Sequence, residues 1–189
     1  MAKFFGNLNA VVAAGFAAMI ALLLWTGTAA NVIGWMTFLH VLCGIMWIGL
    51  LYYFNFVQIP TMPTVPAELK PGVTKYIAPK ALFWFRWSAL ATVLTGIAVA
   101  GHKHYLADAL AFAPGYKVIG LGMWLALIMA ANVWFVIWPN QKKALGIVEA
   151  DADTKAKAAT TAMMASRTNC LLSIPMLFCM VMQNLGGAI

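Results

Sequence analysis

The chain has 189 residues, of which 63% are hydrophobic and 9% are charged. Charged residues make up about a quarter of a typical soluble domain, so the composition excludes that class and predicts an integral membrane protein. The net charge of +7 comes from basic residues that border apolar segments. We therefore expect them to contact membrane lipids, and we expect no nucleic-acid partner.

Apolar segments of membrane-spanning length recur along the chain. A helix needs about 20 apolar residues to cross the hydrocarbon core of a bilayer. Five segments meet this requirement, at approximately 10–26, 32–54, 81–100, 117–138 and 169–184. The sequence therefore predicts an all-α polytopic protein, a single integral membrane domain over residues 1–189, in which the last four spans form a bundle.

The connectors differ in composition. Five prolines between the second and third spans predict a semi-rigid extended connector over residues 57–80. The outer connector predicts a short interfacial helix around residues 105–112. Alanines, acids and lysines after residue 140 favour a helix that continues into the fifth span, where Pro175 predicts a kink.

Basic residues predict the orientation, because cytoplasmic loops retain lysine and arginine. Only Lys103 and Lys117 would lie outside if the N-terminus is cytoplasmic. The other ten of the twelve basic residues would then lie on the inner side: Lys3, Lys70, Lys75, Lys80, Arg86, Lys142, Lys143, Lys155, Lys157 and Arg167. The pattern therefore predicts a cytoplasmic N-terminus and a periplasmic C-terminus.

All three histidines fall in the predicted outer half of the protein. His40 lies inside the second span, and His102 and His104 follow the third span. A neutral imidazole among apolar helices suits a haem iron ligand, so we expect haem b on His40, with His102 or His104 as further cofactor-binding residues. The alternatives are a hydrogen bond from His40 to a neighbouring helix near Thr37 or Thr95, and proton or quinone chemistry.

A second polar layer is predicted at the cytoplasmic side. Arg86 and Trp87 open the third span, Asn132 closes the fourth, and Asn169 opens the fifth. A planar anionic ligand could use the guanidinium for charge, the amides for hydrogen bonds and an indole for stacking. In the alternative interpretation, Arg86 reaches the lipid headgroups, the tryptophans lie at the membrane interface and the amides cap helix ends.

Several segments together resemble a known family. They are HVLCGIMWIGLLYYF at 40–54, FRWSALATVLTG at 85–96, ANVWFVIWPNQKK at 131–143 and SRTNCLLSIPMLFCMVMQN at 166–184. This set resembles the membrane-embedded N-terminal domain of bacterial cytochrome c-type urate oxidases of the PuuD type. The resemblance implies a protein of the bacterial inner membrane that oxidises urate and passes electrons to a c-type cytochrome. Because the chain has no C-x-x-C-H motif, we expect a separate periplasmic cytochrome c as the acceptor.

Two functional hypotheses follow from these features. The first is a redox-type protein related to the urate oxidase N-terminal domain, a urate oxidase-like oxidoreductase if it is catalytic. The second is a non-catalytic membrane subunit that scaffolds a larger respiratory or oxidase complex. Thr168 and Leu185 stand where the family commonly has histidine, which favours the second hypothesis as far as urate is concerned. Glycine pairs such as Gly44 and Gly49 would allow close helix packing in a homo-oligomer or a complex.

Overall fold

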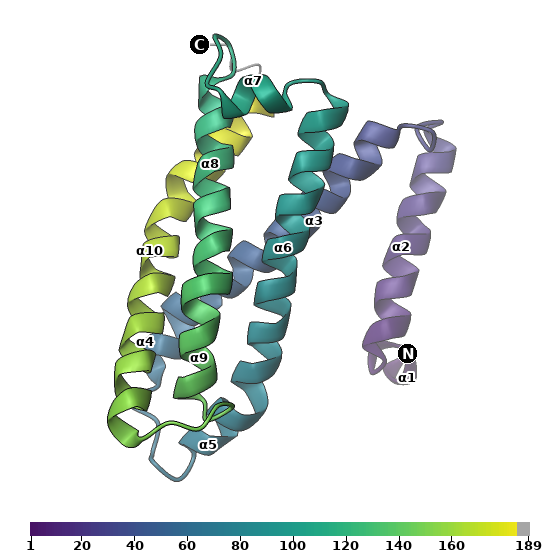
Figure 1. The fold of residues 1–189 in the computed structure, drawn as a ribbon. Coiled ribbons are helices and arrows are strands. Elements are labelled where there is room, and N and C mark those ends of the chain that lie inside the picture. Colours follow the sequence, from purple (N-terminus) through teal and green to yellow (C-terminus); the bar gives the residue numbers. More distant parts are fainter. Residues whose placement is uncertain (185–189) are drawn as a thin grey trace. The chain divides into compact units, whose positions relative to one another are not determined.

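The computed structural model describes residues 1–184, and within that range the chain forms helices joined by turns (Figure 1). Leu185 and the rest of the C-terminus lie outside the described residues. Five helical stretches are long and apolar enough to cross a membrane: Leu8–Trp25, Val32–Thr61, Lys70–His102, Lys117–Ala144 and Ala152–Gln183. For the described residues, the predictions of an all-α fold and of five apolar helices of membrane-spanning length are therefore confirmed. The membrane topology and the orientation of the chain stay predictions.

The chain divides into two compact units, Met1–Trp35 and Met36–Ile189. The first unit holds α1 (Ala2–Phe5), α2 (Leu8–Trp25) and the first turn of α3 (Val32–Tyr52). Asn7 caps α2, because its side-chain oxygen accepts a hydrogen bond from the Ala10 amide at 3.2 Å. None of the α2 side chains is buried.

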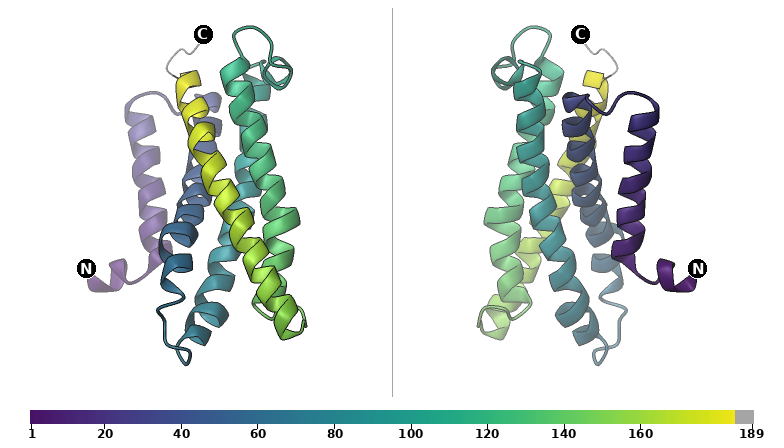
Figure 2. Two further views of the ribbon diagram at one scale, coloured as in Figure 1. Left: turned by 90° about the vertical axis from the view of Figure 1, so that its left-hand side faces the viewer. Right: turned by 90° about the vertical axis from the view of Figure 1, so that its right-hand side faces the viewer.

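The second unit is a bundle of four long helical stretches. They are α3 with η1 (Tyr53–Gln58) and α4 (Ile59–Thr61), η2 (Val73–Ile77) with α6 (Ala78–His102), α8 (Lys117–Asn132) with η3 (Val133–Ile137) and α9 (Trp138–Ala144), and α10 (Ala152–Asn184). Two further short helices are α5 (Lys70–Gly72) and α7 (Leu106–Leu110). Helices α6, α8 and α10 run side by side and α3 crosses them obliquely (Figures 1 and 2).

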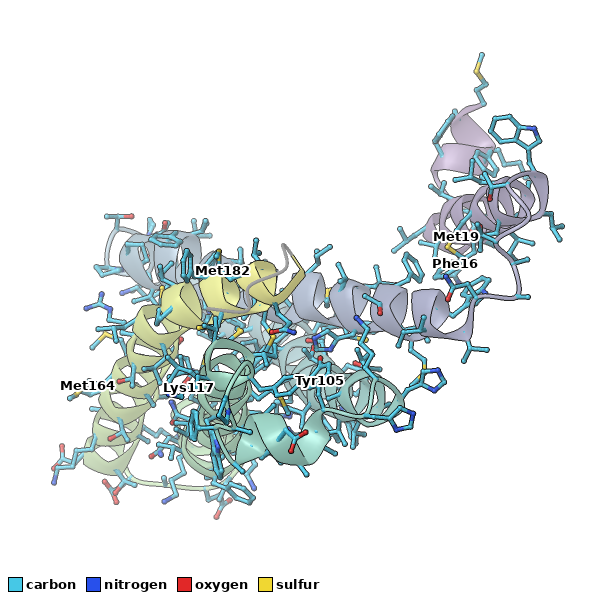
Figure 3. All side chains as sticks on the ribbon, turned by 90° about the horizontal axis from the view of Figure 1, so that it is seen from above. Phe16, Met19, Tyr105, Lys117, Met164 and Met182 are labelled. Carbon is cyan, nitrogen blue, oxygen red and sulfur yellow. The ribbon has the colours of Figure 1, made fainter. Side chains whose placement is uncertain are left out.

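The two ends of this bundle differ in charge. Helix α7 lies at one end, and α4, α5 and α9 lie at the other (Figure 1). Seven lysines belong to the α9 end or its connectors: Lys70, Lys75, Lys80, Lys142, Lys143, Lys155 and Lys157. Only Lys103 and Lys117 flank α7, and Figure 3 shows the bundle from above with Lys117 and Tyr105 labelled.

Three segments of π-helix each lie one turn before a proline. Pro60, Pro79 and Pro139 follow η1, η2 and η3. A proline ring clashes with the carbonyl of the residue four positions earlier, and in each case that residue lies inside the π segment. A wider turn relieves the clash without ending the helix. The predicted extended connector over residues 57–80 is therefore wrong in extent, because helical structure reaches Thr61 and resumes at Lys70.

Helix α10 is 33 residues long and continues through Pro175. The predicted continuity of the polar connector with the fifth span is confirmed from Ala152 onward, whereas residues 145–151 between α9 and α10 are not helical. Asp151 precedes its first turn, and its carboxylate accepts hydrogen bonds from the Thr154 amide and hydroxyl, both at 2.8 Å. These bonds hold the pKa of Asp151 below its ordinary value, so the carboxylate stays ionised where it stabilises the helix terminus.

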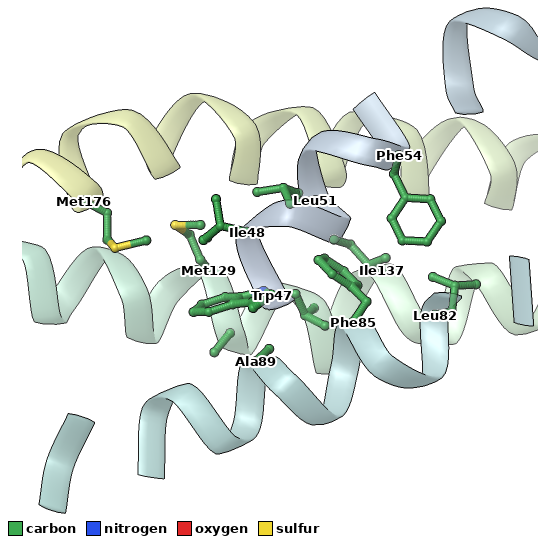
Figure 4. Packing of buried hydrophobic residues seen from close by; sticks show 12 residues of the cluster. Trp47, Ile48, Leu51, Phe54, Leu82, Phe85, Ala89, Met129, Ile137 and Met176 are labelled. Atoms are coloured by element: carbon green, nitrogen blue, oxygen red, sulfur yellow. The ribbon is translucent and has the colours of Figure 1, made fainter. Parts of the chain in front are cut away.

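The apolar core joins α3 and η1 to α6, α8 and α10. Trp47, Leu51, Phe85, Met129 and Val133 are at most 1% exposed and lie in one cluster (Figure 4). Phe54 packs edge-on against Phe85, with ring centroids 5.6 Å apart. This core fixes the middle of α3 against the other helices, and its members Trp47, Ile48 and Met176 also line the cavity described below.

Helix α7 rests directly on the backbone of α8. A Cβ atom on Gly120 would overlap the carbonyl oxygen of Ala109, so only glycine permits this approach. We expect Gly120→Ala to lower the stability of the protein by about 1–3 kcal/mol, because backbone atoms cannot move aside as a side chain can. Gly101→Ala is the matched control, because a Cβ there meets nothing within 4 Å. The check is the thermal unfolding midpoint in detergent, and equal midpoints for the two variants would contradict the prediction.

Candidate functional site

A cavity of about 630 Å³ lies in the second unit, between α3, α6, α7, α8 and α10. Its volume falls in the range of small-molecule and cofactor sites. Most of the wall is aliphatic, as with Val41, Ile48, Ile97 and Leu127, and a few polar side chains interrupt it. An apolar chamber with a small number of polar groups favours a largely apolar ligand that is oriented at a few points.

His40 is one of the polar groups on this wall. Its Nδ1 lies 2.9 Å from the Thr92 carbonyl oxygen and 3.2 Å from the Thr95 hydroxyl oxygen. The alternative prediction, a hydrogen bond from His40 to the Thr95 region of a neighbouring helix, is therefore confirmed. A carbonyl oxygen can only accept, so Nδ1 carries the proton and Nε2 keeps its lone pair in the neutral imidazole. The Thr95 hydroxyl donates to the Ala91 carbonyl at 2.7 Å, which leaves its oxygen as a second acceptor for His40.

Gly96 provides the space that the imidazole occupies against α6. A Cβ atom there would lie 2.9 Å from Cε1 and 3.2 Å from Nδ1 of His40. Real Cβ contacts are essentially never as short as the first of these distances. The absence of a side chain at Gly96 thus allows the ring to reach the Thr92 carbonyl, and the two helices hold the imidazole in one orientation.

Two further polar atoms on the wall are buried and have no hydrogen-bond partner in the described structure. They are Nε1 of Trp47, a donor, and Oε1 of Gln183, an acceptor. Lys103 and Tyr105 line the wall beside α7. Partial burial raises the pKa of the Tyr105 hydroxyl, so it stays protonated and can donate. Buried polar atoms are normally paired, so these two atoms are exceptions in residues that line the cavity.

The structure separates the other two histidines from His40. His102 ends α6 and His104 lies in the following turn with φ 58°, and both side chains are exposed. Neither belongs to the cavity wall. Within residues 1–184, no group of three or more His, Cys, Asp or Glu side chains is placed to hold a metal ion. His40 is thus the single predicted cofactor residue that faces this cavity.

Toward the α9 end, polar side chains on one face of α10 bond to the neighbouring helices. Ser166, Asn169 and Ser173 are all at most 6% exposed. The Asn55 amide donates to Ser166 at 2.9 Å, and the Tyr52 and Ser173 hydroxyls are 3.0 Å apart. These bonds link α10 to α3 and η1, as polar residues commonly do between helices in membranes.

Two of the predicted ligand-binding residues connect α8 to α10. The Asn132 amide donates to the Ala165 carbonyl at 2.9 Å and to Oδ1 of Asn169 at 2.7 Å. Asn169, with no exposed surface, donates in turn to the Met129 carbonyl at 3.0 Å. Their amide donors therefore serve helix packing.

Replacing Asn169 by leucine should weaken this connection. The change removes the bonds to Met129 and Asn132, and interhelical bonds in membranes contribute about 0.6 kcal/mol each on average, so we expect a loss of about 1–2 kcal/mol. The measurement is the unfolding midpoint in detergent. Thr168→Val is the control, because the exposed Thr168 hydroxyl bonds only within its own helix, to Met164 at 3.1 Å. Stability as high as that of the control would show that the network contributes nothing.

The remaining two predicted ligand-binding residues, Arg86 and Trp87, contact different tryptophans and do not join Asn132 and Asn169. Arg86 is 9% exposed, and its Cζ lies 3.4 Å from the ring centroid of Trp138. Trp87 is 48% exposed and packs edge-on against Trp134, with centroids 5.4 Å apart. The structure thus pairs Asn132 with Asn169 but pairs Arg86 with Trp138. Neither the Trp138 contact nor the unpaired Trp47 atom has a signal in sequence spacing, because both depend on how α3, α6 and α9 pack.

Over the described residues, the chain is all-helical, with five apolar helices of membrane-spanning length and polar side chains that join them. These features are consistent with a polytopic membrane protein that has an apolar cavity with one oriented histidine. Residues 110–187 match the family model described as urate oxidase N-terminal. The matched segment holds α8, α9 and α10 with Asn132 and Asn169. It supports the resemblance to the urate oxidase N-terminal domain for the segments at 131–143 and 166–184, and the cytochrome c-type relationship stays a prediction. No curated protein and no solved structure matches the chain.

Proposed function

We propose that the protein is an integral membrane redox protein, related to the N-terminal domain of urate oxidases, that binds haem b in the cavity between α3, α6, α8 and α10. His40 is the iron ligand in this proposal. The protein resides in the bacterial inner membrane and passes electrons to a separate periplasmic cytochrome c. The family match at residues 110–187 supports the relationship, and the geometry of His40 supports the cofactor.

The observation that carries the proposal is the hydrogen bond from His40 Nδ1 to the Thr92 carbonyl. Histidines that bind metals almost always donate their other ring N–H to a carbonyl, a carboxylate or water, which fixes the tautomer and raises the basicity of the free nitrogen. In the structure, which contains no ligand, Nδ1 of His40 already makes this hydrogen bond to the Thr92 carbonyl. Nε2 is the nitrogen left for coordination, and no hydrogen-bond partner is recorded for it in the described structure.

The rest of the cavity fits the same group. Aliphatic side chains suit the porphyrin faces and keep water from the iron. Lys103 and Tyr105 suit the propionates, since one is cationic and the other donates a hydrogen bond. Three methionines on the wall, Met123, Met176 and Met180, offer thioethers, which accompany histidine as iron ligands in some haem proteins. When bound, haem supplies one-electron transfer, and the residues of the chain orient it and exclude water.

A second candidate is a non-catalytic subunit that scaffolds a larger respiratory or oxidase complex. The observation that favours it is α2, which buries none of its side chains and carries alanines four residues apart at Ala10, Ala14 and Ala18. Small residues at this spacing let helices approach closely in membranes. A homo-oligomer or a partner subunit would use such a face.

The deciding experiment is a reduced-minus-oxidised absorption spectrum of the detergent-purified protein, with pyridine treatment to measure haem per chain. A Soret band with sharp reduced bands and about one haem b per chain is the expected result. A featureless spectrum from membranes as well as from detergent would reject haem. Copurified partner chains in that case would support the scaffold, and a quinone in an organic extract would assign the cavity to quinone chemistry.

A further inference from the structure

Arg86 is a buried cation in the helical stretch Lys70–His102, which is long and apolar enough to span a membrane. Its side chain is 9% exposed, and the Nη1 atom is buried without a hydrogen-bond partner in the described structure. An unpaired charge removed from water is costly, and charged residues inside membrane spans commonly mark binding sites or transport paths. The position of Arg86 therefore requires a compensating group.

The nearest recorded partner of Arg86 is the indole of Trp138, which attracts a second cation as well. The guanidinium Cζ lies 3.4 Å from the ring centroid, and the Lys142 Nζ lies 5.7 Å from the same centroid. The electron-rich face of tryptophan attracts a cation but leaves its full charge in place. Two positive side chains are thus held at one ring, and they repel each other unless an anion joins them.

The chain itself offers no acidic side chain on the helices that form this cluster. Its five acidic residues are Glu68, Asp108, Glu149, Asp151 and Asp153. They lie in connectors, in α7 and in the first turn of α10, and none lies in α6, α8 or α9. At the α9 end, the seven lysines named above outnumber the four acidic residues Glu68, Glu149, Asp151 and Asp153, so the charge around the cluster stays positive. A bound molecule can supply the counter-charge that these helices lack.

We propose that Arg86, Trp138 and Lys142 form a binding site for an oxyanion of the phosphate type. The planar guanidinium fork of Arg86 matches two oxygen atoms of such a group, and the Lys142 ammonium adds a point charge. Trp138 forms an apolar wall beside them. The anion is either the headgroup phosphate of an acidic lipid or a free phosphate. None of these three residues lines the cavity of His40, so the site is separate from the proposed haem site.

Thermal stability of the protein purified in a phosphate-free maltoside detergent tests this site, because a ligand that binds the folded state raises the unfolding midpoint. Three preparations are compared: detergent alone, detergent with added phosphatidylglycerol, and detergent with inorganic phosphate against chloride of equal ionic strength. We expect a rise of several degrees with at least one of the two anions. A rise with phosphatidylglycerol alone assigns the site to lipid headgroups, and a rise with inorganic phosphate assigns it to free oxyanions as well.

Variants then locate the effect. Arg86→Gln should weaken the apparent affinity for the anion by about tenfold or more, because it removes the charged fork. Lys142→Gln should reduce the affinity as well, and it keeps the test decisive if Arg86→Gln does not fold. Lys143→Gln is the matched control, since it removes the same charge from the exposed neighbouring position. No rise with either anion in the wild type, or an equal rise in Lys142→Gln and Lys143→Gln, would overturn the proposal.

Discussion

Replacing His40 with alanine is expected to abolish the haem absorbance of the purified protein. The imidazole is the proposed iron ligand, and the Thr92 carbonyl holds it in the tautomer that leaves Nε2 free. Its removal leaves the cavity without a histidine that could coordinate the iron. Haem b has no covalent bond to the protein that could hold it in place instead. We expect haem per chain to fall at least about tenfold. Mutation of a residue that only supports a metal ligand already lowers metal affinity by about 10–100-fold, and here the ligand itself is removed. The measurement is the pyridine-treated spectrum, normalised to protein.

The controls for His40→Ala separate coordination from folding. His102→Ala and His104→Ala remove exposed histidines from the end of α6 and should retain full absorbance. Added imidazole should restore part of the haem band in His40→Ala, because it can enter the space that the side chain leaves. Loss of one interhelical hydrogen bond costs only about 0.6 kcal/mol, so the variant should elute as a folded protein. Full haem content in a folded His40→Ala protein would disprove coordination by this residue.

Gly96→Ala is expected to give the second largest effect, although Gly96 itself carries no chemical group. The added Cβ would lie 2.9 Å from the His40 ring, so the imidazole must move away from α6. That movement breaks the bond between Nδ1 and the Thr92 carbonyl and releases the fixed orientation of Nε2. We expect reduced haem content and a shifted reduction potential, with a stability loss of about 1–3 kcal/mol from the crowding.

Gly101→Ala provides the comparison for Gly96→Ala. It lies five residues further along the same helix, and a Cβ there meets nothing within 4 Å. Haem content, reduction potential and unfolding midpoint should all stay at their wild-type values. If Gly96→Ala and Gly101→Ala gave the same potential and haem content, the close contact between Gly96 and His40 would have no role in cofactor binding.

The sequence alone determined the number and the nature of the long helices. Each span is readable because water is absent from the bilayer core, so a crossing segment must be both apolar and helical. The same logic explains where the expectation for the proline-rich connector was wrong. Helices extended past Pro60 and Pro79, because widened π turns accommodate the proline ring while most backbone groups keep their bonds.

Residue types also identified His40 and the buried polar layer, because histidine, arginine and asparagine are rare inside membrane spans and stand out. Only the tertiary structure decided their partners. It joined Asn132 to Asn169, placed Arg86 on Trp138, and set His40 against Gly96 with His102 and His104 outside the cavity. The physical reason is that a helical sequence fixes the depth of a side chain and its face, whereas contacts depend on the rotation and separation of neighbouring helices, which the packing of the whole core sets.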